Sequence, residues 1–248
     1  MSMSEGAAPG PRPDLPSVAE SRALAEWLSG PRSRALRRAG IGRRQRVLEV
    51  GSGHGVVTGE LRRRAQGEVL CLDRDLAALR GAQASEAPRV AADCRWLPFC
   101  TASFDLLFFQ NTLLWVPELE LATQEAARVL RPGGALVAIE PDYGGMMEHP
   151  RLGLQELWLT GLSAAGADPE VGRKLPSLCE AVGLRTWVEL SHLPRAAGPE
   201  AIRLLDDLPL SEAQRDQVRG LAEALRGQGQ GWSPFVHVPY FLIVASKP

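Results

Sequence analysis

An apolar run that ends in closely spaced glycines, at residues 47–55 (VLEVGSGHG), constrains the fold of this chain most strongly. A short buried strand followed by a glycine turn and a helix is typical of open α/β sheets. Glycine permits the sharp turn and lets a ligand approach the backbone more closely than a Cβ would allow. The free N–H groups at the start of the following helix favour a carboxylate or a phosphate. The segment therefore predicts a ligand site at the carboxyl edge of a parallel sheet.

The rest of the chain alternates apolar runs with helical patterns. Runs at 69–72, 105–110 and 135–140 are almost continuously apolar, as expected for strands covered on both faces. We expect a short strand at 89–91, a later one at 184–190, and an antiparallel last strand at 237–245. Apolar residues at helical spacing indicate helices between these strands, the clearest at 211–226. The pattern predicts an α/β fold with helices on both faces of a doubly wound sheet.

Composition excludes several classes of protein. The 248 residues carry a net charge of −1, so no bulk positive field attracts nucleic acid, and no apolar run is long enough to insert into a membrane. Four cysteines without metal-ligand spacing indicate reduced thiols in a cytoplasmic protein and no metal site. Residues 1–16 are rich in proline and lack an apolar segment, which favours a disordered leader over a signal peptide. Residues 17–248 are expected to form a single domain.

The spacing of the glycines indicates whether the ligand is a dinucleotide. Gly51, Gly53 and Gly55 follow a G-x-G-x-G pattern, whereas a dinucleotide site needs its third glycine where this chain has Val56. This disfavours an NAD-dependent oxidoreductase. Asp73 nevertheless stands at the distance from the loop at which an acid that binds ribose would also be found.

Residues 47–55 resemble motif I of the class I S-adenosylmethionine-dependent methyltransferases, including the small-molecule enzymes of the type-11-like group. Later segments are similar to further motifs of that family in the same order, at 69–73, 92–99, 104–116 and 128–134. The resemblance covers residues 40–141, the expected cofactor-binding core, and by general layout 170–248. It implies a Rossmann-like, seven-stranded, mostly parallel sheet with an antiparallel last strand, and S-adenosylmethionine as the cofactor, with S-adenosylhomocysteine as its product.

The resemblance also implies which residues bind the cofactor. The glycine loop would meet the amino acid part, Asp73 both ribose hydroxyls, Asp93 and the Cys94 backbone N–H the adenine, and Gln110 the methionine moiety. Asp73 could instead be a turn residue, Asp93 a surface acid, and Glu49 a structural acid. The implied set, all near the carboxyl ends of strands, is Glu49, Gly51, Ser52, Gly53, Gly55, Asp73, Arg74, Asp93, Cys94, Gln110 and Asn111.

No catalytic residue is fixed by the sequence. The sulfonium methyl group is already electrophilic, so a base is needed only when the acceptor is a poor nucleophile at neutral pH. Titratable residues near the expected site are the candidates for such a base: His54, Glu140, Asp142, Tyr143 and His149. Asp142 and Tyr143 follow a strong strand and are expected to face the acceptor, although Glu140 and Asp142 could equally anchor loops.

Several features favour a small-molecule acceptor. Residues 110–113 (QNTL) lack the pattern of the amine-methylating nucleic-acid enzymes, and the arginines at 32–46 are interpreted as a solvated face. We expect an N-terminal helix with Leu24, Trp27 and Leu28, together with segments 143–170 and 191–236, to recognise the acceptor. An apolar pocket could be lined by Trp158, Trp232, Met146 and Met147, although each tryptophan could equally pack in the core. We expect a monomer or homodimer. A cofactor-binding protein without turnover and an RNA or protein methyltransferase remain open alternatives.

Overall fold

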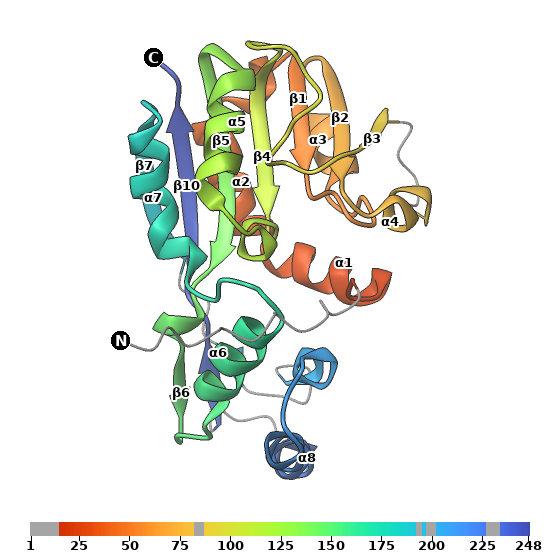
Figure 1. Ribbon diagram of the computed structural model, residues 1–248, viewed down its shortest axis with the longest axis vertical. Helices are drawn as coiled ribbons and strands as arrows, with labels where there is room; N and C mark the ends of the chain where they lie inside the picture. Colours follow the sequence, from red (N-terminus) through yellow and green to blue (C-terminus); the bar gives the residue numbers. More distant parts are fainter. Residues whose placement is uncertain (1–14, 82–86, 192–194, 197–201, 227–233) are drawn as a thin grey trace, which may run out of the picture.

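A seven-stranded sheet forms the centre of the computed structural model, which describes residues 15–81, 87–191, 195–196, 202–226 and 234–248. The strand order is β3-β2-β1-β4-β5-β10-β7, and β10 runs antiparallel to both of its neighbours. Figure 1 shows the parallel strands ending at one common edge. The doubly wound, mostly parallel sheet expected from the sequence is confirmed. Its strands are β1 (Arg46–Val50), β2 (Glu68–Asp73), β3 (Arg89–Ala91), β4 (Phe104–Gln110), β5 (Leu130–Pro141), β7 (Arg185–Ser191) and β10 (Tyr240–Ser246).

Helices cover both faces of this sheet because each strand presents apolar side chains alternately to either side. In β1, Leu48 and Val50 belong to one buried cluster and Val47 to the other. The first cluster includes α5 (Leu119–Val129) and α7 (Val171–Ala181), and the second includes α1 (Val18–Trp27), α2 (Ser29–Arg38) and α3 (Thr58–Arg64). A short α4 (Leu76–Gly81) follows β2.

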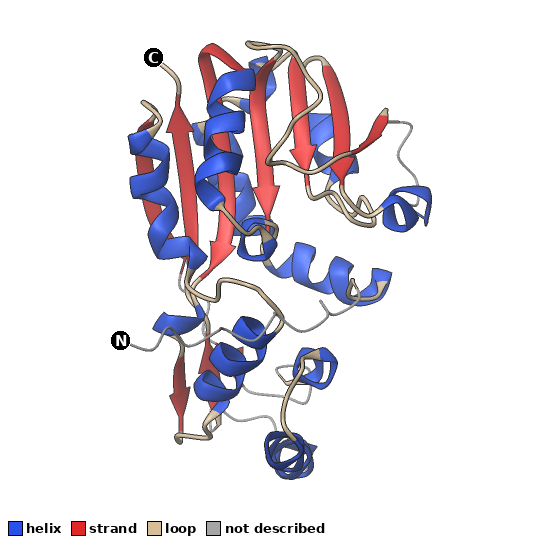
Figure 2. Cartoon of the chain, in the orientation of Figure 1, coloured by secondary structure: helices blue, strands red, loops and turns tan. Residues whose placement is uncertain are grey.

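The β-rich end of the chain is divided into two strands. We expected one strand over 237–245, but β9 (Phe235–His237) and β10 are separated at Val238 and Pro239. Proline has no N–H to donate to a ladder, so it does not continue a central strand. The strand β9 instead pairs with β6 (Met147–His149) and β8 (Arg195–Ala196) in a small three-stranded sheet that the sequence did not predict. Figure 2 shows this sheet apart from the large one.

A second layer of elements lies beyond the carboxyl edge of the large sheet. Figure 1 shows α1 across that edge, with α6 (Leu154–Ala164), β6 and α8 (Glu212–Arg226) farther out. Short 3-10 turns occur at Ile41–Arg43, Leu113–Trp115, Tyr143–Gly145 and Arg203–Asp207. Of the leader expected at 1–16, residues 1–14 lie outside the described residues. Among the described helices, none has the length and apolar character needed to span a membrane.

Two arginines of the stretch 32–46 are buried, so the expectation of a wholly solvated face is wrong for them. Arg32 is 4% exposed and Arg44 is 8% exposed. Arg44 donates to the carbonyl oxygens of Ala39 and Gly133 and so ties the segment before β1 to β5. By contrast, Arg34 forms an ion pair with Glu189 at the surface.

Candidate active site

A cavity of about 680 Å³ lies where the carboxyl edge of the sheet meets the second layer. Its lining combines the loop after β1, the ends of β2 and β4, and side chains from α1, α6 and the turn Arg203–Asp207. The cavity therefore joins the predicted cofactor residues and the predicted acceptor segments in one space. Ten of the eleven predicted cofactor residues line it: Glu49, Gly51, Ser52, Gly53, Asp73, Arg74, Asp93, Cys94, Gln110 and Asn111.

The glycine loop has a backbone that other residues would strain. Gly51 has φ +71°, and a Cβ there would lie 2.2 Å from the Oγ1 atom of Thr112, which sits on the loop after β4. Gly53 has φ +49°, and a Cβ there would meet nothing within 4 Å. Gly51 is thus needed for packing between two loops, while Gly53 leaves its backbone open to the cavity. Gly55 does not line the cavity; its N–H closes the turn onto the carbonyl oxygen of Ser52 at 2.8 Å.

Asp73, at the end of β2, is 8% exposed and faces the glycine loop. Its Oδ2 accepts from the Gly53 N–H at 2.7 Å and its Oδ1 from the Asp75 N–H at 2.9 Å. A carboxylate offers about four lone-pair positions, so two backbone bonds leave capacity for a ligand's hydroxyl groups. The turn role and the ligand role considered for Asp73 are therefore compatible.

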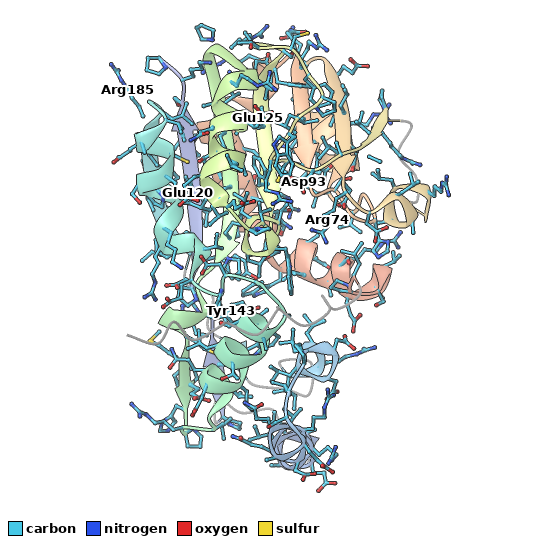
Figure 3. All side chains as sticks on the ribbon, viewed as in Figure 1. Arg74, Asp93, Glu120, Glu125, Tyr143 and Arg185 are labelled. Carbon is cyan, nitrogen blue, oxygen red and sulfur yellow. The ribbon has the colours of Figure 1, made fainter. Side chains whose placement is uncertain are left out.

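Asp93 and its neighbours form the other rim of this region. Arg95 donates to Asp93 from its backbone N–H at 2.9 Å and from its guanidinium at 3.1 and 2.8 Å, and this hydrogen bonding lowers the pKa of Asp93. Arg95 also pairs with Glu118. Figure 3 labels Arg74 and Asp93 together at the end of the sheet. The carboxylate of Asp93 is thus held in place while it lines the cavity.

Two buried glutamates flank the loops. Burial raises the pKa of Glu49 to about 7, although Glu49 accepts from the Thr58 hydroxyl at 2.5 Å. Burial also raises the pKa of Glu140 to about 7; its Oε1 accepts from the N–H groups of Thr112 and Leu113, each at 3.0 Å. Glu49 lines the cavity and Glu140 does not. Glu140 therefore anchors the loop after β4, the structural alternative that the sequence had left open.

Arg32 connects α1 to the cofactor side of the cavity. Its guanidinium donates to the Ala25 carbonyl oxygen at 2.8 Å, to Glu60 on α3 at 2.8 and 2.6 Å, and to the Gln110 Oε1 at 3.2 Å. One buried guanidinium therefore connects three parts of the site: α1 on the acceptor side, α3 behind the glycine loop, and Gln110 at the end of β4. This role was not visible in the sequence, where Arg32 looks like the other arginines of its helix, which are exposed.

The catalytic candidates separate into two groups. His54 and Tyr143 line the cavity; His54 Nε2 lies 3.0 Å from the Pro16 carbonyl oxygen, and Tyr143 stacks on Trp158 at a centroid distance of 4.9 Å. Asp142 and His149 are not among the lining residues. Asp142 instead receives two hydrogen bonds from Arg173, at 2.9 and 2.8 Å. His149 lies exposed in the small sheet.

The acceptor side of the cavity contains predicted and unpredicted residues. Leu24, Trp27, Met146 and Trp158 line it as expected, whereas Leu28 and Met147 do not. Trp232 lies outside the described residues. The sequence did not single out the following lining residues: Leu15, Pro16, Ser21, Thr112, Leu204, Asp207, Leu208, Val236, Val238 and Tyr240. The proline that divides the last strands was the available signal for the turn that brings Val238 and Tyr240 to the site.

The residues at the sheet edge fit S-adenosylmethionine. The loop backbone at Gly53 is open to the cavity, as an approaching amino acid moiety requires. The Ser52 hydroxyl is buried and has no hydrogen-bond partner among the described residues, and Asp73 has spare acceptor capacity. A ligand with polar groups at these positions would satisfy them.

Comparison with known proteins agrees with this fit. Residues 48–138 match the family described as a methyltransferase domain. The chain is 39% identical over 115 residues to a malonyl-acyl carrier protein O-methyltransferase of Pseudescherichia vulneris, covering 46% of this chain and 45% of that protein. It is 38% identical over 101 residues to a demethylmenaquinone methyltransferase of Mycolicibacterium paratuberculosis, covering 41% and 44%. The matched segments thus span less than half of each relative.

Solved structures share the fold at lower identity. The 4+2 cyclase SpnF superposes with a TM-score of 0.58 at 19% identity, covering 92% of this chain and 82% of that one. The sheet order and the superposed structures show the fold of the class I S-adenosylmethionine-dependent methyltransferases, and residues 48–138 match the methyltransferase domain family.

Proposed function

We propose that this chain transfers the methyl group of S-adenosylmethionine to a small-molecule acceptor. The observation that carries the proposal is that the glycine loop and the ends of β2 and β4 line the same cavity as a largely apolar compartment. Direct transfer requires the nucleophile and the methyl group to lie in line within one space from which water is excluded. The related methyltransferases named above support the reaction type.

Each part of the cavity has a role in this proposal. The cofactor supplies an electrophilic methyl group when bound. The loop amides at Gly51 and Gly53 would bind its amino acid part, Asp73 the ribose, and Asp93 with Cys94 the adenine. Gln110, held by Arg32 at 3.2 Å, would orient the methionine end. Side chains of α1 and α6 would orient the acceptor and exclude water.

Proton transfer has two candidate groups in the cavity lining. His54 and Tyr143 lie where an acceptor proton could reach them, and Asp142 and His149 do not line the cavity. An acceptor that is already nucleophilic needs neither group. The variants His54→Gln and Tyr143→Phe test whether either residue acts as a base. A variant that loses kcat while its cofactor affinity is unchanged identifies the base.

A protein that holds the cofactor without methyl transfer is the alternative. The cyclase SpnF has a similar fold, and a shared fold does not determine the reaction, so this alternative needs its own test. The deciding experiment incubates the protein with methyl-labelled S-adenosylmethionine and a metabolite library. The proposal predicts label in a small molecule and formation of S-adenosylhomocysteine. Tight cofactor binding without label transfer to any compound would favour the alternative.

A further inference from the structure

We propose that the acceptor is an uncharged, largely apolar molecule with a planar ring, and that the cavity excludes anionic acceptors. This inference rests on the proposed function and specifies its substrate class. It follows from the part of the cavity lining that lies beyond the cofactor residues, on α1, α6 and the segments around Arg203–Asp207 and β9.

Aromatic side chains are concentrated in this part of the cavity. The chain has only two tyrosines, and both line the cavity. Tyr143 stacks on Trp158 with ring centroids 4.9 Å apart and an interplanar angle of 27°, and Tyr240 meets Trp27 edge to face at 5.3 Å. Figure 3 shows Tyr143 on the α6 side, beyond the level of Asp93. Two aromatic pairs in one cavity favour a planar ring, which stacks on them or meets their edges.

The charges of the lining disfavour an anion. Among the described lining residues, the only Lys or Arg is Arg74, beside Asp73 on the cofactor side. The acceptor side instead contributes one acidic residue, Asp207, at an exposed position of the turn Arg203–Asp207. A carboxylate or phosphate in this compartment would lose hydration without gaining a cationic partner.

A cationic acceptor is less suited than a neutral one. Asp207 is exposed, so water screens much of its attraction for a cation. The remaining acceptor-side surface is built mainly from leucine, methionine, valine and aromatic side chains. Its hydroxyl groups, at Ser21, Tyr143 and Tyr240, offer few oxygen atoms to replace the hydration of an ammonium group. The arrangement therefore favours a neutral ring.

Three naphthalene derivatives that differ only in one substituent test the proposal. The protein, saturated with S-adenosylhomocysteine, is titrated with naphthol, naphthoate and naphthylmethylammonium at neutral pH, and the dissociation constants are compared. We expect naphthol to bind and naphthoate to bind at least about tenfold more weakly. Equal or tighter binding of naphthoate, tighter binding of the ammonium compound, or no binding of naphthol would each overturn the proposal.

Matched variants test whether the preference for naphthol over naphthoate arises in this cavity. Asp207→Lys places a cation in the lining and should reduce the preference for naphthol over naphthoate by about tenfold. Asp206→Lys adds the same charge at the neighbouring exposed position, which does not line the cavity, and should leave the preference unchanged. Tyr143→Leu should weaken naphthol binding, and Tyr143→Phe, which keeps the ring, should restore it. The same change from both lysine variants would contradict the assignment to this cavity.

Binding of S-adenosylhomocysteine and transfer of labelled methyl are measured on the same samples. The absence of both S-adenosylhomocysteine binding and methyl transfer would refute the proposed function. Failure of the naphthol preference alone, with both of them intact, would refute only the acceptor class.

Discussion

Asp73 already accepts backbone hydrogen bonds from Gly53 and Asp75, and this determines what its replacement should do. In Asp73→Ala the ligand hydroxyls lose their acceptor and the glycine loop loses an anchor. We expect S-adenosylhomocysteine binding to weaken by about 1–3 kcal/mol, measured by calorimetry. Asp73→Asn keeps one acceptor oxygen, so its affinity for S-adenosylhomocysteine should lie between those of the natural protein and Asp73→Ala. Asp216→Ala, an exposed acid on α8, is the control. Unchanged affinity in Asp73→Ala would remove Asp73 from the cofactor site.

Glu140 makes stability depend on pH in a direction that can be checked. Its folded pKa is raised from 4.5 to about 7, so the folded protein binds the proton more tightly than the unfolded chain. The contribution of Glu140 to the free energy of unfolding is therefore largest at acid pH and is lost as the pH rises through about 7.

Glu140→Gln removes this titration. We expect the free energy of unfolding of the variant, relative to that of the natural protein, to rise by about 1–3 kcal/mol as the pH increases from 4.5 to just above 7. Urea unfolding at several pH values measures it. Glu120→Gln, at an exposed position on α5, should show no such trend. A stability difference that stays constant across this range would show that folding does not raise the pKa of Glu140.

At the scale of elements, Arg32 makes α1 part of the site. Its guanidinium is 5% exposed in the pair with Glu60, and the same group binds α1 and Gln110. Arg32→Ala leaves Glu60 and the Ala25 carbonyl oxygen without this partner. We expect a loss of about 2–4 kcal/mol in unfolding free energy, because one member of a largely buried pair is removed.

Arg34→Ala is the matched control for that change. Arg34 lies on the same helix, and its partner Glu189 and its own side chain are 34% and 41% exposed. Such surface pairs contribute about 0–1 kcal/mol, so this variant should unfold almost as the natural protein does. Equal losses in the two variants would indicate that Arg32 acts as an ordinary surface residue.

The strands and helices of the large sheet were predictable because their signals are local. Apolar runs fixed β1, β2, β4 and β5, and helical spacing fixed α8. The small sheet was not predictable, since β6, β8 and β9 are two or three residues long and pair only through contacts between distant segments. The burial of Arg32 was missed for a similar reason, because its partners Glu60 and Gln110 are 28 and 78 residues away in sequence.

At the scale of the whole molecule, one cavity joins the sheet edge to the layer beyond it. The cofactor side could be predicted because a parallel sheet brings the ends of its strands to one edge, and the motifs mark those ends. The acceptor side could be predicted only as segments, because helices and turns from α1 to β10 come together there through tertiary packing. Tyr143 lines the cavity, whereas its neighbour Asp142 does not and is paired with Arg173.

Calorimetric titration of the protein with S-adenosylhomocysteine and, separately, with NAD tests the cofactor site directly. A methyltransferase site should give saturable one-to-one binding of S-adenosylhomocysteine that Asp73→Ala weakens, and no binding of NAD. Saturable binding of NAD, with none of S-adenosylhomocysteine, would contradict this prediction.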